Sequence, residues 1–146
     1  MNLIEMQKEV TRMIDEATKE ALVLGDLIEK LKLMPQDAYI YYDFCGLVPN
    51  DAGSYRGYYD HVSVGYVESH ENVVWYQGDN GTVENFIQYL ERQIGCVYMG
   101  WKGGEYIVHA NRKMWAANQG DSTNTAIVDV VAVEDWRVHL ITAYIS

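Results

Sequence analysis

The spacing of apolar residues changes near Tyr39, and the change limits the folds open to this chain. Up to Pro35, apolar residues recur at helical steps of three and four. From Tyr39 onward, most apolar segments are short, rich in β-branched and aromatic residues, and typical of strands. Because strands and helices do not alternate regularly, the sequence predicts an α+β fold. We expect a mainly antiparallel sheet with helices packed on one side, plus an N-terminal amphipathic helix.

The first expected helix, residues 2–21, has one apolar stripe with charged residues on its other faces. Leu24 continues this stripe, whose earlier members are Leu3, Met6, Val10, Met13 and Ala17. We interpret residues 1–22 as a helical arm and residues 23–146 as a single α+β domain. The stripe either packs on its own domain or mediates homo-oligomer formation, and the sequence leaves both alternatives open.

A second helix is expected from Leu24 to Met34, with Leu27, Ile28 and Leu31 facing inward. Gly25 is the expected break between the two helices. Pro35 ends the second one because proline disfavours helical geometry at the residue before it.

The remaining elements follow from composition and turn residues. Strands are expected at 39–44, 61–67, 97–99, 106–108, 114–117, 125–133 and 138–145, with 73–76 as a further candidate. Residues 46–53 are expected to be a loop, because they contain Pro49, Asn50, Asp51 and Gly53. A hairpin is expected at Glu134-Asp135, with a turn longer than two residues.

A third helix is expected to begin after Thr82, a good N-cap residue, and to end near Gly95, a good C-cap residue. Its inward face comprises Val83, Phe86, Ile87, Leu90 and Ile94.

The charge balance excludes several classes of partner. The 146 residues carry a net charge of −10, which disfavours polymeric nucleic acids and anionic membranes and permits a basic protein partner. The N-terminus lacks the layout of a signal peptide, and Cys45 and Cys96 belong to no C-x-x-C pair. We therefore expect a cytoplasmic protein with reduced cysteines.

Two segments combine an isolated cation with aromatic residues and glycine. Arg56 is the only Lys or Arg between Lys32 and Arg92, an interval that contains nine acidic residues. Its segment is Ser54-Tyr55-Arg56-Gly57-Tyr58-Tyr59-Asp60, and the second is Gly100-Trp101-Lys102-Gly103-Gly104-Glu105-Tyr106. Arginine and lysine can hold phosphates, and aromatic rings can stack on a base. Asp60 and Glu105 can bind sugar hydroxyls, and the glycines permit close approach of a ligand.

The alternative for both segments is structural. Arg56 would pair with Asp60 or Asp43 while the tyrosines pack over the sheet, and Gly103-Gly104 would be a tight turn. A Walker A motif is absent, so Lys102 does not belong to a phosphate loop of that type.

Neither a catalytic set nor a metal set is evident in the sequence. The four histidines form no zinc-binding spacing, and the carboxylates form no calcium loop. His61 beside Asp60 could act as an oriented base, but no nucleophile accompanies the pair. We expect no cofactor, no metal and no catalytic residue.

Four segments together resemble a group of small proteins encoded by tailed bacteriophages. They are Gly25–Leu31, Tyr42–Phe44, the Arg56 segment and the Lys102 segment, and the resemblance covers roughly residues 23–133. Residues 1–22 look like an addition, and Trp101 stands where tyrosine is expected. No agreed activity comes with the group, so the resemblance implies only a phage accessory protein acting in the bacterial host cytoplasm.

Three functions follow from these observations. The first is non-catalytic binding, or sequestration, of a small anionic nucleotide-type ligand such as a host immune signal. Its site would comprise Tyr55, Arg56, Gly57, Tyr58, Tyr59, Asp60, Trp101, Lys102, Gly103, Gly104 and Glu105. The second is inhibition of a basic host protein through the acidic surface. The third is a small nucleotide-acting hydrolase that uses His61 and Asp60.

Overall fold

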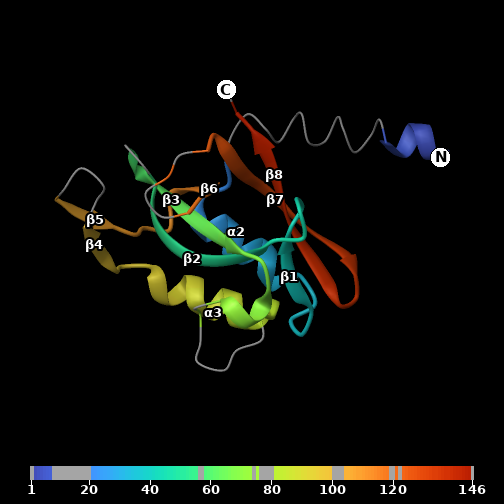
Figure 1. Ribbon diagram of the computed structural model, residues 1–146, viewed down its shortest axis with the longest axis horizontal. Helices are drawn as coiled ribbons and strands as arrows, with labels where there is room; N and C mark the ends of the chain where they lie inside the picture. Colours follow the sequence, from blue (N-terminus) through green and yellow to red (C-terminus); the bar gives the residue numbers. More distant parts are fainter. Residues whose placement is uncertain are drawn as a thin grey trace.

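The computed structural model describes residues 2–7, 21–55, 58–73, 75, 81–99, 104–118, 121 and 123–145. Residues 3–7 are helical. The elements that follow are α2 (Leu24–Lys32), β1 (Tyr39–Tyr42), β2 (Val48–Tyr55), β3 (Tyr58–Val67), η1 (His70–Asn72), α3 (Val83–Gln93), β4 (Val97–Met99), β5 (Glu105–Ile107), β6 (Lys113–Ala116), β7 (Thr125–Glu134) and β8 (Arg137–Tyr144) (Figure 1).

Six strands form one sheet in the order β1-β8-β7-β6-β3-β2, and β4 and β5 form a separate hairpin. Three neighbouring pairs of the large sheet are antiparallel, namely β2–β3, β6–β7 and β7–β8. The pairs β1–β8 and β3–β6 are parallel. Strands β1, β8, β6 and β3 consequently run in one direction. The predicted α+β class, with a mainly antiparallel sheet, is confirmed.

Helices α2 and α3 pack on the sheet through one hydrophobic core. α2 buries Leu24, Leu27, Ile28 and Leu31, and α3 buries Val83, Phe86, Ile87, Tyr89 and Leu90. These side chains join residues of β1, β2, β3, β6, β7 and β8 in a single cluster. Each fully buried side chain of this size contributes roughly 1.5–3 kcal/mol, so the two amphipathic faces hold the helices on the sheet.

The chain just before α2 belongs to the sheet. Strands β6 and β7 are paired only at Trp115 and Ala126. Beside this pair, the Leu22 amide donates to the Ile127 carbonyl (2.9 Å) and the Met114 amide donates to the Leu22 carbonyl (2.9 Å). Residues 21–23 therefore fill the gap where β6 and β7 diverge.

Two predictions about the N-terminal part are wrong. Leu24 does not extend the stripe of the arm, because it begins α2 and is fully buried in the core. Gly25 is not a break, because it lies inside α2 and its amide donates to the Ala110 carbonyl (2.8 Å). A Cβ at Gly25 would lie 3.3 Å from that oxygen, so glycine permits the close approach.

Part of the predicted apolar stripe can be placed. Leu3 and Met6 lie in the described helical residues and are 68% and 51% exposed. Val10, Met13 and Ala17 lie outside the described residues, so homo-oligomer formation through this arm stays a prediction.

The expected loop at residues 46–53 is mostly strand β2. Pro49 lacks the amide donor that a central strand needs, and the turn-forming residues around it suggest a loop. β2, however, is the last strand of the sheet, where proline is tolerated. The register also shifts between Pro49 and Ala52, which accommodates the irregular sequence. Val73 and Trp75 are not in a strand.

The turn between β7 and β8 is shorter than expected. Glu134 pairs with Arg137, which leaves Asp135 and Trp136 as a two-residue loop. The common two-residue hairpin turns require a positive φ in the loop, but neither Asp135 nor Trp136 has one. A register shift between Ala132 and Glu134 adjusts the strands instead.

Helix α3 ends one residue earlier than its apolar stripe suggests. Ile94 follows the last helical residue, Gln93, and is 41% exposed, so its predicted inward position is wrong. Gly95, with φ of +89°, turns the chain away as expected of a residue after a helix end.

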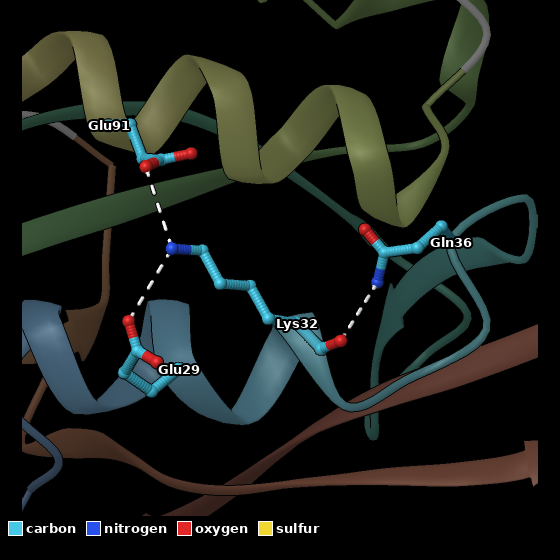
Figure 2. A network of polar contacts seen from close by, with 4 residues as sticks. All are labelled: Glu29, Lys32, Gln36 and Glu91. Atoms are coloured by element: carbon cyan, nitrogen blue, oxygen red, sulfur yellow. Dashed lines mark hydrogen bonds and ion pairs between the residues drawn. The ribbon is translucent and has the colours of Figure 1, made fainter.

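A polar network joins α2 to α3 (Figure 2). The Lys32 ammonium lies 3.5 Å from Glu29 and 3.7 Å from Glu91. All three side chains are exposed to water, so each ion pair contributes less than about 1 kcal/mol. The Gln36 amide group donates to the carbonyls of Leu31 (3.1 Å) and Met34 (2.8 Å) near the end of α2. This side chain therefore supplies partners that the helix end lacks.

Within the described ranges, no helix has the length and apolar character needed to cross a membrane.

Candidate functional site

The described residues of the two predicted segments belong to two hairpins, β2–β3 and β4–β5. Tyr55 ends β2 and pairs with Tyr58 at the start of β3. Gly104 precedes β5, and Glu105 pairs with Met99 of β4. Arg56, Gly57, Trp101, Lys102 and Gly103 lie outside the described residues, and only the backbone of Tyr58, Tyr59 and Asp60 is described, as part of β3.

The two hairpins are neighbours. β4 contacts β2, and both hairpins lie on the left side of Figure 1. Gly104 has a φ of +81°, in the left-handed region that favours glycine. This conformation suits either the predicted anion-binding loop or a tight turn. The strands that lead into the Arg56 and Lys102 segments thus share one region of the molecule.

Tyr55 is held inside the structure. Its side chain is 2% exposed, and its ring lies 5.1 Å from the Trp115 ring and 5.7 Å from the His61 ring. Its hydroxyl oxygen accepts hydrogen bonds from the amides of Thr123 (3.1 Å) and Asn124 (3.0 Å). These contacts give Tyr55 a structural role and leave its ring little surface to offer a ligand.

His61 also has a structural contact. The Trp115 indole N–H donates to Nδ1 of His61 at 2.9 Å. Nδ1 therefore carries no hydrogen, and in the neutral ring the hydrogen is on Nε2. A base must offer an unprotonated nitrogen to its substrate, and here that nitrogen is occupied by the indole. This arrangement does not favour the hydrolase hypothesis.

No group of three or more His, Cys, Asp or Glu side chains in the described part of the chain could hold a metal ion.

A second aromatic cluster lies on β1 and β8, and sequence reasoning missed it. The Arg137 guanidinium carbon lies 4.1 Å from the centre of the Tyr41 ring, and the Arg137 Nε–H donates to Nε2 of His139 (2.7 Å). The Tyr41 ring meets the His70 ring edge-on at 4.8 Å. Because alternate residues share one face of a strand, the sequence shows which residues of β1 or of β8 lie together. It contains no local signal that β1 pairs with β8.

The pKa of His139 is lowered from its ordinary value, first by burial and then by the charge of Arg137, with Asp43 acting in the opposite direction. A neutral His139 is also the acceptor that Arg137 requires. Because the folded pKa is below the unfolded pKa of about 6.5, His139 stabilises the fold above that pH. This contribution is lost as the pH falls from there through the folded pKa.

We therefore expect His139→Gln to weaken the pH dependence of stability between about pH 7 and 5. Urea unfolding at several pH values measures it. The exposed His109 provides the control variant His109→Gln. If the stability of His139→Gln and that of the unmodified protein fall by the same amount on acidification, His139 does not supply this dependence.

A pocket of about 330 Å³ opens at one end of the sheet. It lies where β1, β3, β6 and β8 end and β7 begins, and it is lined by Phe44, Tyr66, Ala116, Thr123, Thr125, Thr142, Ala143 and Tyr144. Sequence reasoning missed this pocket because its walls come from the ends of five strands. None of the lining residues carries a charge.

No protein-family model, curated protein or solved structure matches this chain, so its function is inferred from its own residues.

Proposed function

We propose that this protein binds a small anionic ligand of the nucleotide type at the β2–β3 and β4–β5 hairpins, without turnover. Arg56 and Lys102 hold the phosphates, because a guanidinium and an ammonium are the natural partners of phosphate oxygens. Tyr58, Tyr59 and Trp101 wall the base, and Asp60 and Glu105 accept hydrogen bonds from the sugar. Gly57, Gly103 and Gly104 allow the ligand to approach the backbone.

The observation that carries this proposal is the contact between β4 and β2. The two segments are far apart in the sequence, and a shared site requires their hairpins to meet. The contact of the strands that lead into them supports such a meeting. The pocket at the other strand ends offers an anion no positive charge from its lining residues.

The resemblance to phage proteins suggests a biological role for this binding. A phage accessory protein that sequesters a host immune signal needs affinity and no chemistry. Binding without catalysis agrees with the structural contact that occupies Nδ1 of His61. We therefore favour sequestration over hydrolysis in the bacterial cytoplasm.

A thermal-shift screen with mono-, di- and cyclic nucleotides tests the proposal, because a ligand of the native state raises the melting temperature. We expect at least one nucleotide to stabilise the protein. Arg56→Ala and Lys102→Ala should each weaken its binding by about tenfold or more, the typical value of a charge-assisted hydrogen bond.

Lys32→Ala is the matched control, since it removes one exposed positive charge from the end of α2. It should leave nucleotide affinity unchanged. Absence of stabilisation by every nucleotide, or equal weakening by all three substitutions, contradicts the proposal.

One feature favours a second candidate, inhibition of a basic host protein. The β7–β8 hairpin exposes Val131 (41%), Val133 (45%) and Trp136 (55%) beside the exposed acidic residues Glu134 and Asp135. Exposed tryptophan with apolar neighbours is typical of interfaces, and the carboxylates would attract a basic partner. Capture from host lysate should then lose its partner at high salt and in Trp136→Ala. A salt-insensitive partner argues against this candidate.

A further inference from the structure

The hydroxyl hydrogens of the threonines that line the strand-end pocket are all committed to protein acceptors. The Thr123 hydroxyl donates to the Ala116 carbonyl (2.7 Å), and the Thr125 hydroxyl donates to the Thr123 carbonyl (3.3 Å). The Thr142 hydroxyl donates to Oδ1 of Asp43 (2.6 Å). Carbonyl and carboxylate oxygens can only accept, so these directions are fixed by chemistry. The three threonines therefore present lone pairs, and no hydrogens, to a ligand.

A carboxylate adds negative charge at the edge of this pocket. Asp43 precedes Phe44, and its two oxygens accept from the hydroxyl and the amide (2.9 Å) of Thr142. Each oxygen keeps a lone pair for a further donor. The described Lys and Arg residues lie away from the strand ends that form the pocket. They belong to α2 and α3 or to the starts of β6 and β8, and they are Lys30, Lys32, Arg92, Arg112, Lys113 and Arg137.

Aromatic rings complete the wall. The rings of Phe44 and Tyr66 meet edge-on at 5.8 Å, and Phe44 stacks on Tyr42 at 5.0 Å. Tyr42 is itself fixed, because it is buried and its hydroxyl donates to the Val64 carbonyl (2.6 Å). These rings give the pocket apolar walls that suit an alkyl chain. Among the side chains that line the pocket, the hydroxyls of Tyr66 and Tyr144 can either donate or accept.

We propose that this pocket is a second binding site, for a small organic cation whose charged head carries N–H donors, such as an alkylguanidinium or alkylammonium. Lone pairs and a carboxylate favour positive charge, and the committed hydroxyls disfavour an anion. A volume of about 330 Å³ lies at the small end of ligand pockets, which suits a short alkyl chain. The site shares no residue with the proposed nucleotide site and does not depend on it.

Three probes of similar size separate charge from hydrogen bonding in an NMR titration of the ¹⁵N-labelled protein. Butylguanidinium has charge and donors, butylurea has donors without charge, and butyltrimethylammonium has charge without donors. We expect saturable shifts of the Tyr66, Thr125 and Thr142 amides with butylguanidinium. The affinity for each of the other two probes should be lower by about tenfold or more.

Asp43→Asn tests the carboxylate, because it removes the charge while the amide oxygen can still accept from one of the two Thr142 donors. We expect about tenfold weaker butylguanidinium binding and unchanged butylurea binding. Asp135→Asn, in the turn at the opposite end of β8, makes the same change in net charge and should have no effect. Equal weakening in both variants means diffuse attraction to an acidic protein and overturns the proposal. So does butylurea binding as tight as butylguanidinium binding, or the absence of saturable shifts in the unmodified protein.

Discussion

Gly81→Ala is expected to lower the free energy of unfolding by about 3 kcal/mol. Gly81 has a φ of +74°, which an L-residue adopts at a cost of about 1–2 kcal/mol. A Cβ there would also lie 2.9 Å from Cγ of His70 and closer still to Cδ2. Real side chains do not reach such distances, so the imidazole or the backbone must move.

The His70 ring is not free to move aside. Its Nε2 lies 3.1 Å from the Ile40 carbonyl, which can only accept, so the hydrogen is on Nε2. The ring also contacts the rings of Tyr39 (5.0 Å) and Tyr41 (4.8 Å). Gly81 in turn accepts from the Ile40 amide (3.2 Å). Together they cover the outer edge of β1, which would otherwise expose unpaired backbone groups.

Gly46→Ala is the matched control for this substitution. Gly46 also has a positive φ, +62°, but a Cβ there would meet nothing within 4 Å. Gly46→Ala should lower the free energy of unfolding only by the backbone contribution of about 1–2 kcal/mol. Urea unfolding followed by circular dichroism measures both variants. A double variant with His70→Ala should recover part of the Gly81→Ala loss, since the clashing ring atoms are gone. Equal losses for the two glycine variants would refute the close approach of Gly81 to His70.

Local signals were enough to predict the helices of the domain. The residues predicted to face inward in α2 and α3 are all buried apart from Ile94, and the structure also buries Leu24 and Tyr89. The N-cap of α3 is also as predicted, because the Thr82 hydroxyl accepts from the Asn85 amide (3.3 Å). Helix periodicity and capping depend on residues a few positions apart, so a single sequence contains them.

Features that depend on distant pairing could not be predicted. Pro49 suggests a loop, and only the edge position of β2 makes a strand possible there. The parallel pairing of β1 with β8 joins the two ends of the domain, and nothing in either strand specifies its partner. The strand-end pocket depends on that sheet order. Its acceptor character depends further on hydrogen bonds such as that between Thr142 and Asp43.

The candidate nucleotide site lies between these cases. Unusual composition identified two segments, and the sequence could not show that their hairpins are neighbours. It also could not separate Tyr55 from the other tyrosines of its segment. The partners of its hydroxyl, the amides of Thr123 and Asn124, lie in the chain before β7.

Tyr55→Phe is therefore expected to lower the free energy of unfolding by about 2 kcal/mol while keeping the ring contacts with Trp115 and His61. The substitution leaves two part-buried amides without this acceptor, and each such loss costs about 1–3 kcal/mol when water cannot replace it. One of them belongs to Asn124, whose φ of +55° is unusual for a residue other than glycine. The Tyr55 hydroxyl helps to hold this conformation at the start of β7.

Tyr144→Phe is the matched control, because Tyr144 is 69% exposed and loses the same atom. It should change stability by less than about 0.5 kcal/mol. The comparison also separates structure from binding. If Tyr55 is structural, Tyr55→Phe lowers the urea midpoint and leaves nucleotide affinity intact at a temperature where the protein is folded. Arg56→Ala should show the reverse. A Tyr55→Phe variant with normal stability and weakened nucleotide binding would instead return Tyr55 to the ligand site.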